Sequence, residues 1–285
     1  MPTFDSPEPI TATIDVVAGD VRISAAERGD TVVDVAPSDA SSDDDRHAAE
    51  QTRVEYANGR LLVKQPKLRH WLPGNTGGSI SVTIELPAGS RVQATGGLAD
   101  FDSDGRLGET RIKTGLGRIQ LDRVQTLTVK SGTGDVIVEH VAGHAEVRAG
   151  SGDVRVRELG TTAVVKNSNG DTWVGDAGGD LRVNAANGNI AVDRARATVD
   201  AKSANGDVRL GEVTRGSVVL ETHLGDLEVG IPEGTAAWLD LRSTAGKVHN
   251  ELEAADAPEP STDTVEVRAR TAVGDVVVRR PAVSA

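Results

Sequence analysis

The chain contains no cysteine, and this absence removes several classes of function at once. Without a thiol there is no disulfide framework, no thiolate zinc site and no cysteine nucleophile. Aromatic residues are also scarce, with two Phe, one Tyr and three Trp among 285 residues. A core built around large rings is therefore excluded, and Val, Ile, Leu and Ala must supply the buried side chains.

Basic residues are in the minority, with 31 Lys and Arg against 43 Asp and Glu, which gives a net charge of −12. Because a polyanion needs a concentrated Lys and Arg surface, we expect neither nucleic acid nor an anionic membrane as the main partner. The sequence has no long apolar run and no basic start followed by an apolar segment. We therefore expect no membrane insertion, no secretory signal and a cytoplasmic location.

Glycine, in contrast, is abundant, and part of it recurs at a fixed period. Nine glycines follow one another at spacings of 17, 18, 18, 18, 18, 19, 21 and 28 residues. They are Gly117, Gly134, Gly152, Gly170, Gly188, Gly206, Gly225, Gly246 and Gly274. A period near eighteen that loosens toward the C-terminus is typical of stacked structural repeats, or rungs.

Apolar residues stand at fixed offsets from these glycines. Positions seven and five before the glycine, and two and four after it, carry mainly Val, Ile, Leu or Ala, as Leu181, Val183, Ile190 and Val192 do around Gly188. This alternation predicts two β-strands per rung. A lone rung cannot offset the entropy of ordering eighteen residues, whereas stacking pairs the backbone groups of successive rungs. We predict an all-β fold, a single-stranded parallel β-solenoid (β-helix) with rungs of about 18 residues.

The repeat is less regular before Gly117. The segment around Gly19 matches the unit, and those around Gly59 and Gly97 match it loosely. Between them, "SDASSDDDRHAAEQ" and "KQPKLRHWLPGNTGGS" are read as loop insertions. We predict that residues 1–105 form an irregular N-terminal β region that caps the solenoid. Residues 106–285 would form the regular repeats of one continuous domain, with an insertion near 250–263.

Aspartate follows the turn glycine at seven places, Asp20, Asp135, Asp153, Asp171, Asp207, Asp226 and Asp275. A calcium ladder or a carboxylate pair for sugar chemistry would explain this row, and so would a turn residue that caps a local N–H. Calcium-binding β-rolls have the pattern G-G-x-G-x-D, whereas the Asp of "SGTGDVIV" follows its glycine directly. Lys or Arg four residues before many of the glycines could neutralise the row without metal. The spacing favours a structural corner.

Few other residues are candidates for a site. His140 and His144 have the spacing of two zinc ligands on a helix, but Gly143 and the strand register argue against a helix there. Trp173 and Trp238 fall on outward strand positions, where a ring could stack on a sugar, bind a partner or pack under a loop. There is no nucleophile elbow, P-loop or dinucleotide fingerprint. We assign no catalytic residue, no metal ligand and no cofactor.

The strings "SGTGDVIVEH", "KNSNGDTWVGD" and "AKSANGDVRLGEV" resemble the bacterial β-strand-repeat family of unknown function whose members carry the provisional name of adhesins. The segments "MPTFDSPEPI" and "AAEQTRVEYANGRLLV" look similar to actinobacterial members. The resemblance covers nearly the whole chain and implies exposure on a surface. It supplies no catalytic residues.

We therefore expect a non-enzymatic β-solenoid that serves as a binding or scaffold surface, with a protein or a glycan as partner. Two alternatives stay open at this point. A polysaccharide-acting β-helix enzyme would need a cleft with two carboxylates, or a base beside basic residues. A self-assembling scaffold would stack its open ends into filaments. The oligomeric state and the number of faces per rung do not follow from the sequence.

Overall fold

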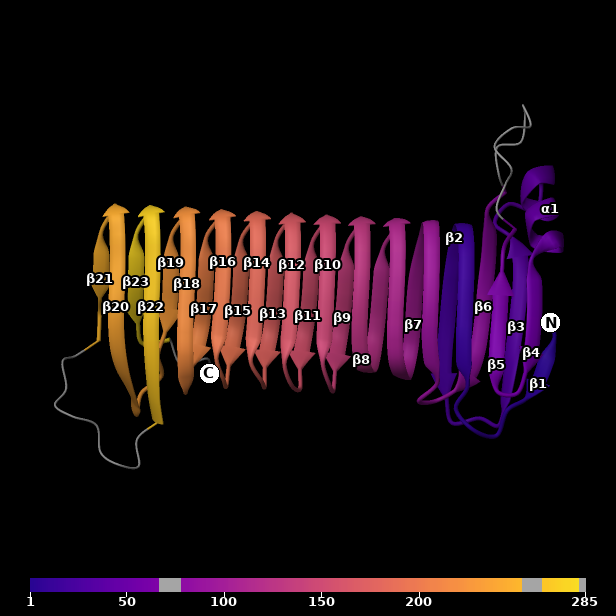
Figure 1. The fold of residues 1–285 in the computed structure, drawn as a ribbon, viewed down its shortest axis with the longest axis horizontal. Coiled ribbons are helices and arrows are strands. Elements are labelled where there is room, and N and C mark those ends of the chain that lie inside the picture. Colours follow the sequence, from indigo (N-terminus) through magenta and orange to yellow (C-terminus); the bar gives the residue numbers. More distant parts are fainter. Residues whose placement is uncertain (67–77, 253–262, 282–285) are drawn as a thin grey trace. The chain divides into compact units, whose positions relative to one another are not determined.

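The computed structural model describes residues 1–66, 78–252 and 263–281, which form 23 strands and one helix (Figure 1). The predicted all-β class is confirmed. The chain divides into two compact units, Met1–Ala142 and Gly143–Ala285. The boundary expected at residue 105 stays a prediction. Trp71 and most of the insertion expected near 250–263 lie outside the described residues.

Unit 2, Gly143–Ala285, contains the regular repeat, and each of its rungs has one strand before the turn glycine and one after it. The strands before the glycines form a first stack of β10 (Ala145–Ser151), β12 (Ala163–Asn169), β14 (Leu181–Asn187), β16 (Val199–Asn205), β18 (Gly216–Leu224), β22 (Asp263–Val273) and β20 (Thr235–Ala245). The strands after them form a second stack of β11 (Val154–Leu159), β13 (Thr172–Ala177), β15 (Ile190–Ala195), β17 (Val208–Val213), β19 (Leu227–Gly230), β23 (Val276–Arg279) and β21 (Val248–Asn250). Neighbours in both stacks pair in parallel, which confirms the parallel β-solenoid.

The predicted inward positions form the core of unit 2. Val165, Val183 and Ala201 lie directly above one another in the first stack, and all three are fully buried. Ile190 and Val208 stack in the same way in the second. These columns of small apolar side chains explain how the protein manages with so few aromatic residues.

The last two rungs of unit 2 do not stack in sequence order. The rung made of β22 and β23 has a neighbouring rung on each side (Figure 1). One neighbour is the rung made of β18 and β19, and the other is the rung made of β20 and β21. The inward residues Val267 and Ala269 of β22 are fully buried, whereas Asn250 of β21 occupies an inward position and is exposed. Enclosing Asn250 between two rungs would bury an unpaired amide, so its rung is better placed at the end of the stack.

Unit 1, Met1–Ala142, joins parallel rungs to antiparallel strands. Its elements are β1 (Thr3–Asp5), β2 (Thr11–Ala26), β3 (Asp30–Pro37), α1 (Asp43–Gln51), β4 (Arg53–Ala57), β5 (Arg60–Lys64), β6 (Ile80–Pro87), β7 (Arg91–Leu116), β8 (Ile119–Thr133) and β9 (Val136–Val141). β2 pairs in parallel with β5 and β6 on one side and with β7 on the other. β3 pairs antiparallel with β1 and β6, and β4 with β5. These antiparallel strands form the expected irregular N-terminal region.

Two of the loosely matching glycines in unit 1 are not rung corners. Asn58 and Gly59 have positive φ, 51° and 69°, and form the two-residue turn of the antiparallel β4–β5 hairpin. Gly97 lies inside the continuous strand β7. The residue at the corner is Ala99, because it pairs with Gly19 and Gly117 stacks on it. The true corner is therefore two residues later, and the spacing from Ala99 to Gly117 is the regular eighteen.

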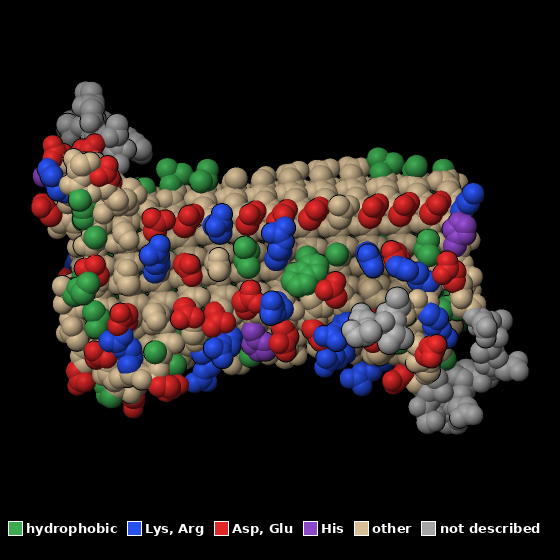
Figure 2. Space-filling view, turned by 180° about the vertical axis from the view of Figure 1, so that it is seen from behind, with side chains coloured by type: hydrophobic (Ala, Val, Ile, Leu, Met, Phe, Trp, Pro, Cys, Tyr) green, Lys and Arg blue, Asp and Glu red, His purple; other side chains and the backbone are tan. Residues whose placement is uncertain are grey.

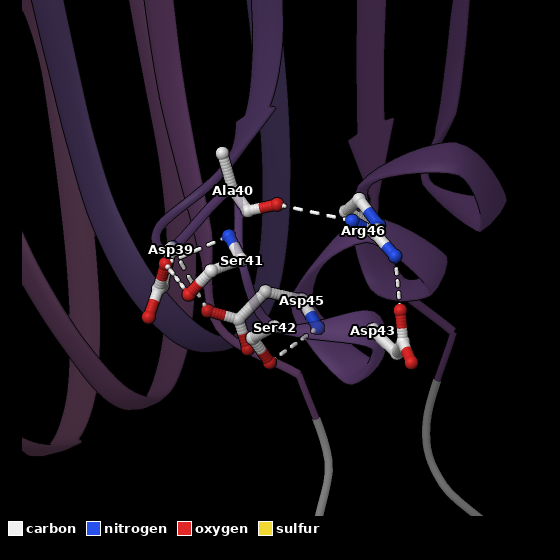
Figure 3. A network of polar contacts seen from close by, with 7 residues as sticks. All are labelled: Asp39, Ala40, Ser41, Ser42, Asp43, Asp45 and Arg46. Carbon is white, nitrogen blue, oxygen red and sulfur yellow. Dashed lines mark hydrogen bonds and ion pairs between the residues drawn. The ribbon is translucent and has the colours of Figure 1, made fainter.

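The reading of "SDASSDDDRHAAEQ" as a loop was wrong, because residues 43–51 form the helix α1 (Figure 3). Ser42 caps the helix, since its Oγ accepts the N–H of Asp45 at 3.3 Å. Three acidic residues occupy the first turn, where the helix dipole favours negative charge. Arg46 donates to Ala40 O and forms an ion pair with Asp43. α1 is not long and apolar enough to cross a membrane.

Candidate functional site

The aspartates that follow the turn glycines support the backbone of the next rung. From Asp153 to Asp275, an oxygen of the side chain that follows the turn glycine accepts the N–H of the residue at the same position one rung further along the stack. In unit 2 these bonds run from Asp171 to Asp153 at 3.0 Å, Asn189 to Asp171 at 2.8 Å, Asp207 to Asn189 at 2.9 Å, Asp226 to Asp207 at 2.8 Å, Asp275 to Asp226 at 2.7 Å and Lys247 to Asp275 at 2.7 Å. We call this row the corner ladder. Its acidic side chains follow one another in Figure 2.

Two further ladders hold the same corner. Asn169, Asn187 and Asn205 bond to one another, with Nδ2 to Oδ1 distances of 3.0 and 2.8 Å. At five of the rungs of unit 2, the residue three before the turn glycine donates from its hydroxyl or amide to the carbonyl of the turn glycine in the adjacent rung, as Ser203 does to Gly188 at 3.1 Å. Asn167, Asn169 and Asp171 of "NSNGDTWVGD" therefore have a structural role. Their side chains pair with backbone groups at the bend that strand pairing leaves without a partner.

Three of the basic residues expected to neutralise the corner ladder contact other acids, namely Lys202, Arg242 and Arg270. Lys202 lies 2.9 Å from Glu221 and 3.8 Å from Asp200 on the first stack. The hydrogen bond that Lys202 donates to the Glu221 carboxylate, with the nearby charge of Asp200, raises the pKa of Lys202. Arg270 and Arg242 bond to Asp240, at 3.1 and 3.0 Å, and this lowers the pKa of Asp240. These ion pairs lie on the outward face of the strands. The side chains of the corner ladder accept backbone N–H groups and not these basic side chains.

A metal site finds no support in the described residues. His140 belongs to the strand β9, so His140 and His144 do not lie one turn apart on a helix, as two zinc ligands of this spacing would. The imidazole Nδ1 of His144 lies 3.1 Å from both oxygens of Thr162, its backbone carbonyl and its hydroxyl. Across residues 1–66, 78–252 and 263–281, no three His, Asp or Glu side chains converge as metal ligands.

A polar hollow on unit 1 is one place where the enzyme alternative could act. It is lined by Asp20, Val21, Arg22, Asp100, Phe101, Asp102, Arg118 and Gln120. Its three carboxylates and two guanidinium groups are the residue types that such chemistry needs. All three carboxylates are exposed, whereas a general acid at neutral pH is usually buried, and Asp100 already accepts the N–H of Arg118 at 2.7 Å. The hollow thus repeats the corner arrangement.

Trp173 is held on the outward face of the second stack of unit 2. It lies between Arg155 of β11 and Ala191 of β15 in the strand register, and it is partly exposed. Its indole Nε1–H donates to Oδ1 of Asp193 at 3.2 Å. At the other end of the ring, Cη2 is so close to Gly175 that a β-carbon there would lie 3.2 Å from it. The indole is therefore fixed at both ends among small residues.

Trp238 occupies a different place, on β20 in the last rung of the first stack. Its side chain is 57% exposed, and the guanidinium of Arg268 lies 6.0 Å from the ring centre. The packing under a loop that we considered for both tryptophans is found for neither among the described residues. The partner Asp193 of Trp173 was not foreseen. Its separation of 20 residues, one rung plus two positions along the strand, is the signal that could have indicated it.

Comparison with known proteins identifies relatives of this architecture. The family model described as Toastrack DUF4097 matches residues 11–279. No curated protein matches the chain.

Three solved structures are similar over nearly the full chain. A "putative cell adhesion protein" from Clostridium sporogenes is 14% identical over 98% of both chains, with a TM-score of 0.24. A "putative adhesin" from Bacteroides fragilis is 14% identical over 97% of this chain and 96% of its own, with a TM-score of 0.33. A "putative lipid binding protein" from Parabacteroides distasonis is 11% identical over 96% and 95%, with a TM-score of 0.32.

Proposed function

This chain belongs to the Toastrack DUF4097 family, and from that premise we propose that it is a non-enzymatic β-solenoid that binds a protein or a glycan. The binding face is the outward side of β11, β13, β15 and β17 around Trp173. The narrower likeness to actinobacterial members stays a prediction, as does the cytoplasmic location.

The position of Trp173 is the observation that carries this proposal. Tryptophan and arginine are the residues most enriched where binding energy concentrates in interfaces. Here an indole stands in the same column as Arg155, beside the carboxylate of Asp193. Because the ring is already fixed at Asp193 and Gly175, little side-chain entropy is lost when a partner covers it. A parallel stack of strands also supplies a rigid face.

The neighbours of Trp173 suit a ligand with both apolar and hydrogen-bonding surface. Gly175, Ala191 and Gly211 have no side chain larger than a methyl group, so little protrudes from the strand surface beside the ring. Asp193 and Arg155 are exposed next to it and offer an acceptor and donors. A sugar, or a peptide with polar and apolar groups, presents such a surface, and neither requires a reaction.

We expect the change Trp173→Ala to weaken binding to the protein's ligand at least about tenfold, because a central tryptophan commonly contributes more than 1.4 kcal/mol to binding. The probes are an array of bacterial and host glycans, and peptides selected from a random library on the immobilised wild-type protein. Since the ring is outside the core, the melting temperature should change little.

The matched control is Val164→Ala, which removes a partly exposed outward side chain from β12 in the other stack. This variant should bind every selected ligand as the wild-type protein does. Equal affinity of Trp173→Ala and wild type for all ligands would contradict the proposal. The absence of any glycan or peptide ligand for the wild-type protein would contradict it too.

A further inference from the structure

The last strand of the first stack, β20, has one open edge. It pairs with β22 through ten residue pairs on one side, and no strand of the described residues pairs with its other side. An edge of this length presents a row of backbone donors and acceptors that another strand can satisfy. We propose that β20 pairs antiparallel with β20 of a second copy, which makes the protein a two-fold symmetric dimer.

The direction of the backbone groups follows from the regular rungs. Seven residues before a turn glycine, the N–H points to the next rung, as that of Leu181 does to Thr198 O at 2.9 Å. Leu239 is the equivalent residue of β20, seven before Gly246. Backbone groups alternate in direction along a strand, so those of Leu239 and Leu241 point to the open edge, while Asp240 faces β22.

Among registers with the two-fold axis at residue 240, 241 or 242, the side chains favour one. With the two-fold axis at Leu241, Asp240 lies opposite Arg242 of the second copy, and Arg242 lies opposite the second copy's Asp240. With the axis at Asp240 two carboxylates would meet, and with the axis at Arg242 two guanidinium groups would meet. Opposite charges on facing residues stabilise a strand pair, and like charges destabilise it. The axis at Leu241 is therefore favoured.

The same register covers apolar surface at the end of the core. Leu239 and Leu241 are only partly buried in β20, in contrast to the fully buried Val267 and Ala269 that they contact in β22. Pairing would place Leu241 against its own copy and bury it further. Trp238, 57% exposed, would face Thr244 of the second copy.

The symmetry also determines the size of the assembly. An isologous contact uses the same edge on both copies and closes at two. A filament would need a second, different contact that continues the stack. The pairing of β20 therefore points to a dimer and not to the self-assembling filament considered from the sequence. It does not depend on the Trp173 face.

Charge reversal at the facing residues tests this inference. We expect the wild-type protein to sediment as a dimer, and Arg242→Asp and Asp240→Arg each to weaken self-association more than about tenfold, because like charges then face each other. The double variant with both changes restores opposite charges and should dimerise as the wild type does. A monomeric wild-type protein, or a double variant no better than the single ones, would overturn the proposal.

Cross-linking gives a second test that leaves one of the two facing charge pairs in place. The chain has no cysteine, so introduced thiols are unambiguous. Facing residues of a non-hydrogen-bonded antiparallel pair are about 4.5 Å apart at Cα, which suits a disulfide. A mixture of the Asp240→Cys and Arg242→Cys proteins should form a disulfide-linked dimer on mild oxidation, and neither variant alone should. Cross-linking of a single variant, or none in the mixture, would contradict the register.

Discussion

The change Val183→Asp should prevent soluble folding of the protein. Val183 of β14 is fully buried and stacks between Val165 and Ala201, which are also fully buried. A carboxylate there has no partner within the columns, and burial of an unpaired polar group costs about 2–7 kcal/mol. The loss of a buried valine adds roughly 1.5–3 kcal/mol. Together these approach the whole stability of a typical domain, about 5–15 kcal/mol.

The neighbouring substitution Asn184→Asp is the matched control, because it introduces the same carboxylate one residue further along the strand. Asn184 points outward and lies between Lys166 and Lys202 in the register. A charge there gains two cationic neighbours, so we expect stability within about 1 kcal/mol of the wild type. Soluble expression and circular dichroism distinguish the two variants. A soluble, native-like Val183→Asp protein would mean that the strand faces are reversed.

We expect the change Gly188→Val to destabilise the protein by about 2–5 kcal/mol. Gly188 has a φ of 137°, a conformation that costs a residue with a β-carbon about 1–3 kcal/mol. The new β-carbon would also lie 2.1 Å from the carbonyl oxygen of Gly170 in the rung below. This oxygen belongs to the paired backbone, so relief requires the two rungs to separate, with the cost of overpacking in addition.

Gly234→Val separates these two contributions. Gly234 also has a positive φ, 80°, but a β-carbon there would meet nothing within 4 Å. Only the strain should remain, about 1–2 kcal/mol. Midpoints of denaturant unfolding measure both variants. A loss in Gly188→Val no larger than that in Gly234→Val would show that the close stacking of the corners does not limit the side chain.

The rungs could be predicted from the sequence because their pattern is local and repeated. Val183 and Ile190 have fixed offsets from Gly188, and the same offsets describe most of the other rungs. The rule failed at Gly97, where the corner is Ala99, because a corner without positive φ does not require glycine. It could not show the exchanged order of the last rungs, since parallel strands of similar pattern compete for the same neighbour.

The candidate site was predictable to a smaller extent. The structural role of Asp171 followed from its place directly after Gly170, and the structure adds the acceptor role toward Asn189 that explains it. The contact of Trp173 with Asp193 joins two rungs, and outward residues follow no apolar rule that would mark them. Likewise the helix α1 lacks an apolar stripe, since none of its residues is buried. Its caps and acidic first turn were the signal present in the sequence.

The central claim is that the polar repeat residues hold the rungs together and are not a binding site. Amide hydrogen exchange at Asp207 tests it most directly, because its N–H donates to Oδ1 of Asn189 at 2.9 Å. In the wild-type protein this amide should be protected. In Asn189→Ala it should exchange about tenfold faster, as expected for one lost hydrogen bond, while the amide of Asp226, held by Asp207, stays unchanged. An Asp207 amide that is unprotected in the wild type, or equally protected in Asn189→Ala, would contradict the claim.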